Sequence, residues 1–234
     1  LAADATMFGP SAVRLTIVGA NKMAMPTSPS SVNVKYGKRR RFFFFDFGSP
    51  TAYLAWTQLP GICTAAGADL VYRPMLLGGV FQATGNVSPV SVPAKGKYML
   101  ADMARFARRY GVPMTFNPHF PINTLQLMRG AVGVQSRMPE RFVDYVTAVY
   151  EATWVDARNM GDLATVAEVL ERVGFDPRAI LDLASDPAVK QALKDNTEEA
   201  VRRGAFGAPT MFVGQAMYFG QDRLDFVREA LTER

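Results

Sequence analysis

The sequence predicts an α/β protein in which one long helical insertion separates two groups of sheet-forming segments. A strand-helix-strand pattern occupies residues 41–75, and a hairpin followed by a helix occupies residues 205–234. Between them, residues 76–204 carry helical patterns separated by prolines and glycines. This order predicts a thioredoxin-like domain built from the two outer segments, with an all-helical insertion between them. Residues 1–40 show no sustained periodicity and are expected to be a poorly ordered extension.

The domain is expected to open with a strand over Arg41–Phe47, because a short aromatic run is typical of a strand buried on both faces. Gly48 ends that strand. Ser49 then offers a hydroxyl suited to an N-cap, and Pro50 fits the first position of a helix that runs toward Gly61. A tight turn is therefore expected between the strand and the helix.

A second strand is expected over Asp69–Arg73, where Pro74 stops it. The insertion that follows contains six expected helices, each bounded by proline, glycine or a polar cap. They are Lys95–Tyr110, Asn123–Ser136, Pro139–Glu151, Gly161–Val173, Pro177–Ala184 and Pro187–Arg203.

The strand pattern returns near the C-terminus. Thr210–Val213 and Ala216–Phe219 flank Gly214-Gln215, a two-residue connection typical of a β-hairpin. A last helix is expected over Gln221–Thr232. The hairpin and this helix complete the predicted domain.

The formal charge of +5 belongs to the N-terminal extension and not to the predicted domain. Residues 1–41 hold seven Lys and Arg residues and one acidic residue, whereas residues 42–234 hold 19 basic and 20 acidic residues. A nearly neutral body has no broad basic face for a phosphate backbone, so no nucleic-acid partner is expected. No apolar run reaches about 18 residues, so no membrane span is expected either.

Cysteine usage indicates a reducing compartment. The only cysteine, Cys63, cannot form an internal disulfide, and the chain has no cysteine cluster to hold zinc, so no metal site is expected. A cytoplasmic setting fits best. Residues 1–40 are basic and poor in acids, as a mitochondrial transit segment is, which makes the mitochondrial matrix the alternative.

Ser49 is the first candidate for chemistry, because a hydroxyl at a helix start lies where backbone N–H groups and the helix dipole favour a negative charge. The alternative is that Ser49 is only a helix cap. A role as nucleophile would need an adjacent base, and the only histidine, His119, lies in a proline-flanked loop.

The turn at Ser49 has the outline of a Cys-x-x-Cys loop, with Ser49 and Ala52 at the positions of the two sulfurs. Cys63 lies well along the helix and is interpreted as a small core residue, so a reactive sulfur would have to arrive with a ligand. Pro209 enters a strand, and in this fold a cis Ala208–Pro209 bond would leave the backbone of Ala208 able to pair with a peptide-like ligand.

Four ordered motifs carry a family resemblance. They are Phe44–Ala55, Thr84–Asn86, Pro93–Met99, and Gly204–Thr210 followed by Phe219–Arg223. With them the chain, over residues 42–232, resembles the 2-hydroxychromene-2-carboxylate isomerases and the kappa-class glutathione transferases. The resemblance implies a thioredoxin-like fold and glutathione as cofactor.

The resemblance also implies the residues that hold glutathione. Ser49 would be catalytic and donate a hydrogen bond to the thiolate, while Asn86 and Lys95 would bind toward the glycyl carboxylate. Such donors suit a ligand with two carboxylates and one amine. Read singly, Lys95 could equally be a solvated lysine on a helix face.

At the other end of the ligand, the resemblance implies that the backbone of Ala208 beside Pro209 pairs with the cysteinyl portion, and that Gln221 and Asp222 hold the γ-glutamyl end. Kappa transferases have a small hydroxyl residue where Gln221 stands, and often a larger residue than Ala208. These departures favour the isomerase branch and leave the backbone contacts unchanged.

The function that the resemblance implies is a glutathione-dependent cis-trans isomerisation of an aromatic conjugated keto acid, in aromatic-compound catabolism. The partners would be glutathione and a small aromatic substrate, with a homodimer left open. One alternative is a transferase that conjugates glutathione to electrophiles. Another is a non-catalytic glutathione-binding or chaperone-like module. Four aromatic residues of the insertion are candidates to line the substrate pocket: Phe81, Tyr98, Phe120 and Trp154.

Overall fold

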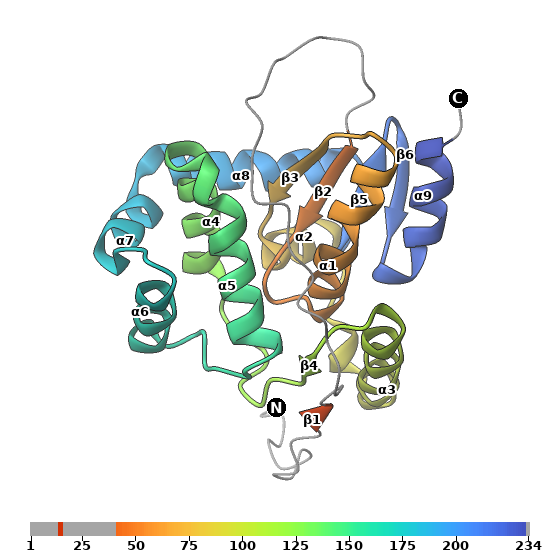
Figure 1. The fold of residues 1–234 in the computed structure, drawn as a ribbon, viewed down its shortest axis with the longest axis horizontal. Helices are drawn as coiled ribbons and strands as arrows, with labels where there is room; N and C mark the ends of the chain where they lie inside the picture. Colours follow the sequence, from red (N-terminus) through yellow and green to blue (C-terminus); the bar gives the residue numbers. More distant parts are fainter. Residues whose placement is uncertain (1–13, 16–40, 233–234) are drawn as a thin grey trace.

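The computed structural model describes residues 14–15 and 41–232. Its main sheet has four strands in the order β3-β2-β5-β6. β2 (Arg41–Phe45) pairs in parallel with β3 (Leu70–Pro74) and antiparallel with β5 (Thr210–Val213), which pairs antiparallel with β6 (Ala216–Phe219). The sheet therefore joins the start of the described body to its end, as the sequence predicts (Figure 1).

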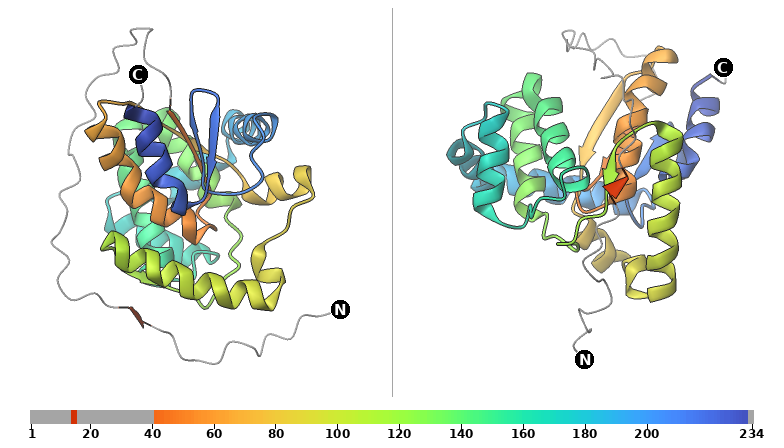
Figure 2. Two further views of the ribbon diagram at one scale, coloured as in Figure 1. Left: turned by 90° about the vertical axis from the view of Figure 1, so that its right-hand side faces the viewer. Right: turned by 60° about the horizontal axis from the view of Figure 1, so that its bottom comes forward.

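Helices cover both faces of this sheet. α1 (Pro50–Ala65) packs beside α9 (Leu224–Thr232) on one face, and α8 (Pro187–Arg202) lies on the other face against β3 (Figures 1 and 2). The central strand is buried from Phe43 to Phe45, each without exposed surface. An aromatic run buried on both faces is what the sequence predicts for this position.

The strand and helix next to the turn differ in length from the prediction. β2 ends at Phe45 and not at Phe47, while α1 continues past Gly61 to Ala65. Pro60 lies inside this helix. The helix continues because its buried face also continues, with Ile62 and Cys63 in the core, and tertiary packing outweighs the local propensity of proline and glycine.

The insertion contains the six expected helices, with ends shifted by a few residues. They are α3 (Pro93–Tyr110), α4 (Leu125–Arg137), α5 (Phe142–Trp154), α6 (Leu163–Arg172), α7 (Pro177–Ser185) and α8. A short 3-10 turn, Pro139–Arg141, precedes α5 where the sequence predicts continuous helix. α4 packs against α5, α7 and α8, so these helices form one bundle beside the sheet (Figure 1).

The insertion also contains elements that the sequence does not predict. α2 (Leu77–Thr84) follows β3 directly, and a 3-10 turn (Pro89–Ser91) precedes α3. The strand β4 (Met114–Thr115) interrupts the helical pattern and pairs antiparallel with β1 (Arg14–Leu15). The regular elements of the insertion are thus helical apart from the two residues of β4.

The expectation of a poorly ordered extension over 1–40 lies outside the described residues, except for β1. The C-terminal end matches closely, with a 3-10 turn (Gln221–Arg223) leading into α9. Within the described part of the chain, each helix is too short or too polar to span a membrane. No group of three or more His, Cys, Asp and Glu side chains there could hold a metal ion.

Candidate active site

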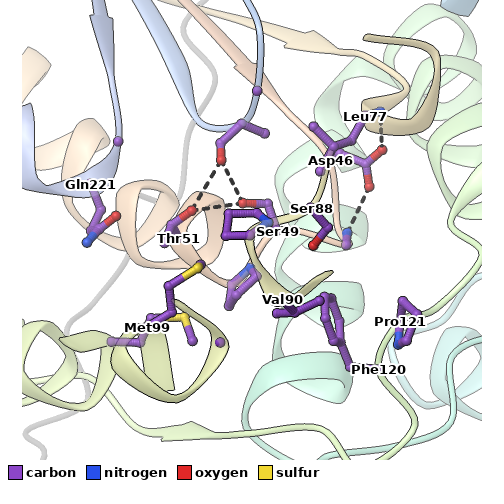
Figure 3. A pocket seen from close by; sticks show the side chains of 18 of the residues that line it. Asp46, Ser49, Thr51, Leu77, Ser88, Val90, Met99, Phe120, Pro121 and Gln221 are labelled. Atoms are coloured by element: carbon purple, nitrogen blue, oxygen red, sulfur yellow. Dashed lines mark hydrogen bonds between the residues drawn. The ribbon is translucent and has the colours of Figure 1, made fainter. Parts of the chain in front are cut away.

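A cavity of about 550 Å³ opens where the sheet meets the insertion. Five segments line it: the turn into α1, the stretch from α2 into α3, the loop around residues 116–124, the loop before the β5–β6 hairpin and the end of that hairpin with the turn after it. In Figure 3, Ser49 and Thr51 lie between Gln221 on one side and Phe120 on the other. Segments far apart in sequence therefore build one pocket.

Ser49 lies at the base of this cavity and is almost fully buried. It is the N-cap of α1, where its Oγ accepts the backbone N–H of Ala52 at 3.1 Å. The same hydroxyl donates to the carbonyl of Ala208 at 2.9 Å. The Ala208–Pro209 bond is cis, as expected for this fold, and the Ala208 carbonyl lies beside Ser49.

Thr51 adds a second hydroxyl to the same place. Its Oγ1 lies 2.9 Å from Ser49 Oγ and 3.2 Å from the Ala208 carbonyl oxygen, to which it can donate. Thr51 is half-buried and lines the cavity. Two hydroxyls therefore share one carbonyl acceptor (Figure 3).

Asp46 fixes the turn that carries Ser49. Its carboxylate is 1% exposed and accepts the N–H of Gly48 at 2.8 Å and the N–H of Leu77 at 2.7 Å. Burial raises the pKa of Asp46, although these two N–H groups and the Thr124 hydroxyl act to lower it. One carboxylate thus connects the turn before α1 with the start of α2.

Asn86 and Lys95 lie on the wall formed by the insertion. Asn86 is exposed and lines the cavity, and its amide donates to the carbonyl of Phe206 at 2.8 Å. Lys95 is exposed, and the adjacent Gly96 lines the cavity while Lys95 itself does not. The structure brings Asn86 to the cavity of Ser49, whereas Lys95 is only next in sequence to a lining residue.

Gln221 and Asp222 line the opposite wall. Gln221 is buried, and its backbone carbonyl accepts the hydroxyl of Tyr110 at 2.6 Å. Asp222 is exposed and pairs with Arg223 at 2.7 Å. Ala208 lines the cavity beside them, whereas Pro209 does not.

Two of the four aromatic candidates, Phe81 and Phe120, line the cavity. Tyr98 is exposed. Trp154 is buried, and its Nε1 donates to the Phe47 carbonyl at 2.8 Å.

Burial raises the pKa of Cys63 to about 11, so this thiol is a poor nucleophile at neutral pH.

Comparisons with known proteins now identify the family. A model of the DSBA-like thioredoxin domain matches residues 42–232. The chain belongs to the DSBA-like thioredoxin family. Within this family, 2-hydroxychromene-2-carboxylate isomerase of Sphingobium xenophagum is 34% identical over 196 residues, covering 82% of this chain and 97% of that protein. Glutathione S-transferase kappa 1 of Rattus norvegicus is 28% identical over 203 residues, covering 82% and 90%.

A solved structure of 2-hydroxychromene-2-carboxylate isomerase has the same fold. It superposes with a TM-score of 0.73 at 30% identity, covering 82% of this chain and 93% of that one. The resemblance inferred from four motifs and the thioredoxin-like fold are both confirmed. This chain carries Ser49 and Ala52 in the turn that begins the first helix of the domain. It therefore has no thiol pair there for disulfide exchange.

Two residues of the cavity are absent from the sequence prediction. Asp46 is visible as the one charged residue in a run of phenylalanines, and a buried carboxylate needs several donors. Thr51 gives no such signal, because a threonine in the first turn of a helix is common. Its significance comes only from the Ala208 carbonyl, which lies 157 positions away in the chain.

Proposed function

We propose that this protein is a glutathione-dependent isomerase that acts on an aromatic conjugated keto acid of the 2-hydroxychromene-2-carboxylate type. The observation that carries the proposal is the buried Ser49 hydroxyl at the N-terminus of α1, facing a cavity beside the Ala208 backbone. Three relatives named 2-hydroxychromene-2-carboxylate isomerase, 31–34% identical, support the choice of reaction.

The polar groups of the cavity suit glutathione. A hydroxyl at a helix start can face a thiolate, the amide of Asn86 can bind a carboxylate, and the carboxylate of Asp222 can bind an amine. Lys95, next in sequence to a lining residue, can add a cation for the glycyl end. When bound, glutathione would supply a thiolate whose reversible addition to a conjugated double bond permits rotation.

Ser49 has one principal task in this proposal, which is to favour the ionised thiol. An unperturbed thiol has a pKa of about 8.5 and is mostly protonated at neutral pH. A hydrogen bond to a charged group is worth about 1.5–3 kcal/mol, which corresponds to a roughly 10- to 150-fold gain in thiolate. The N–H groups of the first turn of α1 add to this effect.

The apolar part of the cavity would receive the aromatic substrate. Phe81, Met99 and Phe120 line it from three segments of the insertion, and Figure 3 shows Met99 and Phe120 on either side of the space before Ser49. Such a wall excludes water and orients a flat ring. The thiol and the ring would thus meet above Ser49.

The decisive test is incubation of the protein with an o-hydroxybenzylidenepyruvate, with and without glutathione, followed by ultraviolet absorbance. Isomerisation that requires glutathione supports the proposal, and isomerisation at equal rate without it refutes the cofactor assignment. Ser49→Ala should lower turnover far more than glutathione affinity, whereas Lys95→Ala should weaken binding and leave the pKa of the bound thiol almost unchanged. If Ser49→Ala changes neither turnover nor that pKa, Ser49 is only a helix cap.

A second candidate is conjugation of glutathione to electrophiles, supported by the kappa-class relative and by the same site residues. Mass spectrometry of the products separates the two reactions, because a transferase leaves a stable thioether and an isomerase releases glutathione. A cytoplasmic setting and a role in aromatic-compound catabolism complete the proposal. They rest on the single buried thiol and on the relatives' names.

A further inference from the structure

At the base of the cavity, three oxygen–oxygen contacts are served by only two hydroxyl protons. Three oxygens, Ser49 Oγ, Thr51 Oγ1 and the Ala208 carbonyl, lie within 2.9–3.2 Å of one another. The two hydroxyls carry one proton each. Only two of the three contacts can therefore be hydrogen bonds at any moment.

Ser49 has no spare proton in this arrangement. Its Oγ already accepts the Ala52 N–H, and its single O–H donates to the Ala208 carbonyl. If Ser49 turned its proton toward a thiolate, a buried carbonyl would lose that donor. Leaving a buried acceptor without a partner is destabilising and would cancel much of what the new hydrogen bond contributes.

Thr51 can remove this conflict, because its hydroxyl reaches both oxygens. When Ser49 donates elsewhere, Thr51 can donate to the Ala208 carbonyl at 3.2 Å, and the carbonyl keeps a partner. If Thr51 instead donated to Ser49 Oγ at 2.9 Å, neither hydroxyl would donate to the Ala208 carbonyl. Only the first arrangement therefore releases the Ser49 proton and keeps a donor on the carbonyl.

We propose that Thr51 is a positioning residue that frees the Ser49 hydroxyl to donate to the glutathione thiolate. This inference rests on the proposed function. A purely local role for Thr51 does not explain its geometry, because its hydroxyl also reaches, at 3.2 Å, a carbonyl from the loop before β5. Thr57 provides the contrast, since its hydroxyl donates to Leu54 of the same helix at 2.7 Å.

The test uses the pKa of the bound glutathione thiol, titrated by its thiolate absorbance in the ultraviolet. Thr51→Val keeps the branched shape and removes the hydroxyl. A neutral hydrogen bond is worth about 0.5–1.5 kcal/mol, so the variant should raise the thiol pKa by about 0.4–1.1. Thr51→Ser should restore the wild-type pKa. Thr57→Val, the same change on the same helix and also half-buried, should leave it unchanged.

A kinetic measurement adds a second readout. Thr51→Val should lower kcat by roughly 2- to 10-fold at neutral pH, with little change in the KM for glutathione, because ligand contacts elsewhere remain. Should Thr51→Val fold poorly, Thr51→Ala, which also lacks the hydroxyl, should show the same higher pKa.

The outcomes separate the two proposals. If Ser49→Ala raises the thiol pKa and Thr51→Val does not, the inference about Thr51 is overturned and the proposed function stands. A larger effect from Thr51→Val than from Ser49→Ala would also overturn it, because Thr51 would then be the direct donor. If the wild-type protein does not bind glutathione, both proposals fail.

Discussion

Replacing Asp46 by asparagine should destabilise the fold, because two backbone donors depend on its two oxygens. Asp46 Oδ1 accepts the Gly48 N–H and Oδ2 accepts the Leu77 N–H. Asparagine has one oxygen and must direct its NH₂ group at the other N–H. One hydrogen bond is then lost, and two donors face each other in a site that is almost fully buried.

The magnitude follows from this exchange. Where Asp46 is protonated, both of its oxygens can still accept an N–H; losing one such hydrogen bond costs about 0.5–1.5 kcal/mol, and an unsatisfied buried N–H costs about 1–3 kcal/mol. As Asp46 ionises at higher pH, the wild type buries a charge that the variant lacks, which offsets part of the loss. We expect a net decrease of about 2–4 kcal/mol in the free energy of unfolding, or roughly 5–15 °C in Tm for a chain of this size.

The pH dependence gives a sharper test. Burial raises the pKa of Asp46 above 3.8, so the folded state holds this proton better than the unfolded state does. The contribution of Asp46 to stability is therefore fully present below about pH 4 and declines as the pH rises through the folded pKa. The asparagine side chain of the variant does not titrate, so the difference in stability between wild type and Asp46→Asn should shrink as the pH rises from about 4 through the folded pKa of Asp46.

Urea denaturation of both proteins across this pH range measures the difference directly. Asp176→Asn is the matched control, because Asp176 accepts the Arg178 N–H at the start of α7 but is exposed. Aspartate and asparagine are nearly equivalent as caps, so the control should lose only a few tenths of a kcal/mol. If the stability difference between wild type and Asp46→Asn grows with pH, the reasoning is refuted. The N–H donors would then lower the pKa of Asp46 by more than burial raises it.

Three further predictions concern the walls of the cavity and the core. Cys63 has a pKa of about 11, so in the folded protein it should react with iodoacetamide at about pH 8 roughly 100-fold more slowly than an ordinary thiol. Unfolding should remove this protection. Rapid labelling of the folded protein would contradict the burial of this thiol. Gly207→Ala would place a Cβ 2.8 Å from the Phe219 ring, which must then shift in the wall of the cavity. Calorimetry should therefore show the affinity for glutathione falling several-fold. Unchanged affinity would show that the ring moves aside without affecting the site. Tyr110→Phe, which removes the donor to the Gln221 carbonyl, should cost about 1 kcal/mol in urea denaturation, and no loss would make that bond irrelevant to stability.

The sequence predicts best those elements whose signals are local. The hairpin of β5 and β6 is marked by Gly214-Gln215 between two apolar runs, and its strands have the predicted ends. The helix after Ser49 is marked by a cap hydroxyl and Pro50. The sequence predicts the end of this helix too early, because Pro60 is a local stop signal that buried packing overrides.

α2 shows why the rest could not be predicted. Its sequence contains Gly78 and Gly79, and its N-cap, Leu76, has no side-chain hydrogen bond. The start of the helix is held from elsewhere: Asp46 accepts the Leu77 N–H, and Thr197 accepts the Leu76 N–H at 2.9 Å. Capping groups 31 and 121 positions away leave no pattern in the local sequence.

The same distant partners argue that the insertion and the sheet domain form one structural unit. On one side of the cavity, Asp46 of the sheet domain binds the start of α2 at 2.7 Å. On the other side, Tyr110 of α3 binds the Gln221 carbonyl at 2.6 Å. The rings of Phe47 and Tyr150 pack across the same boundary at 4.9 Å. Separating residues 76–204 from the rest would leave buried donors and acceptors unpaired on both sides, so both parts of the chain are needed to hold the walls of the cavity in place.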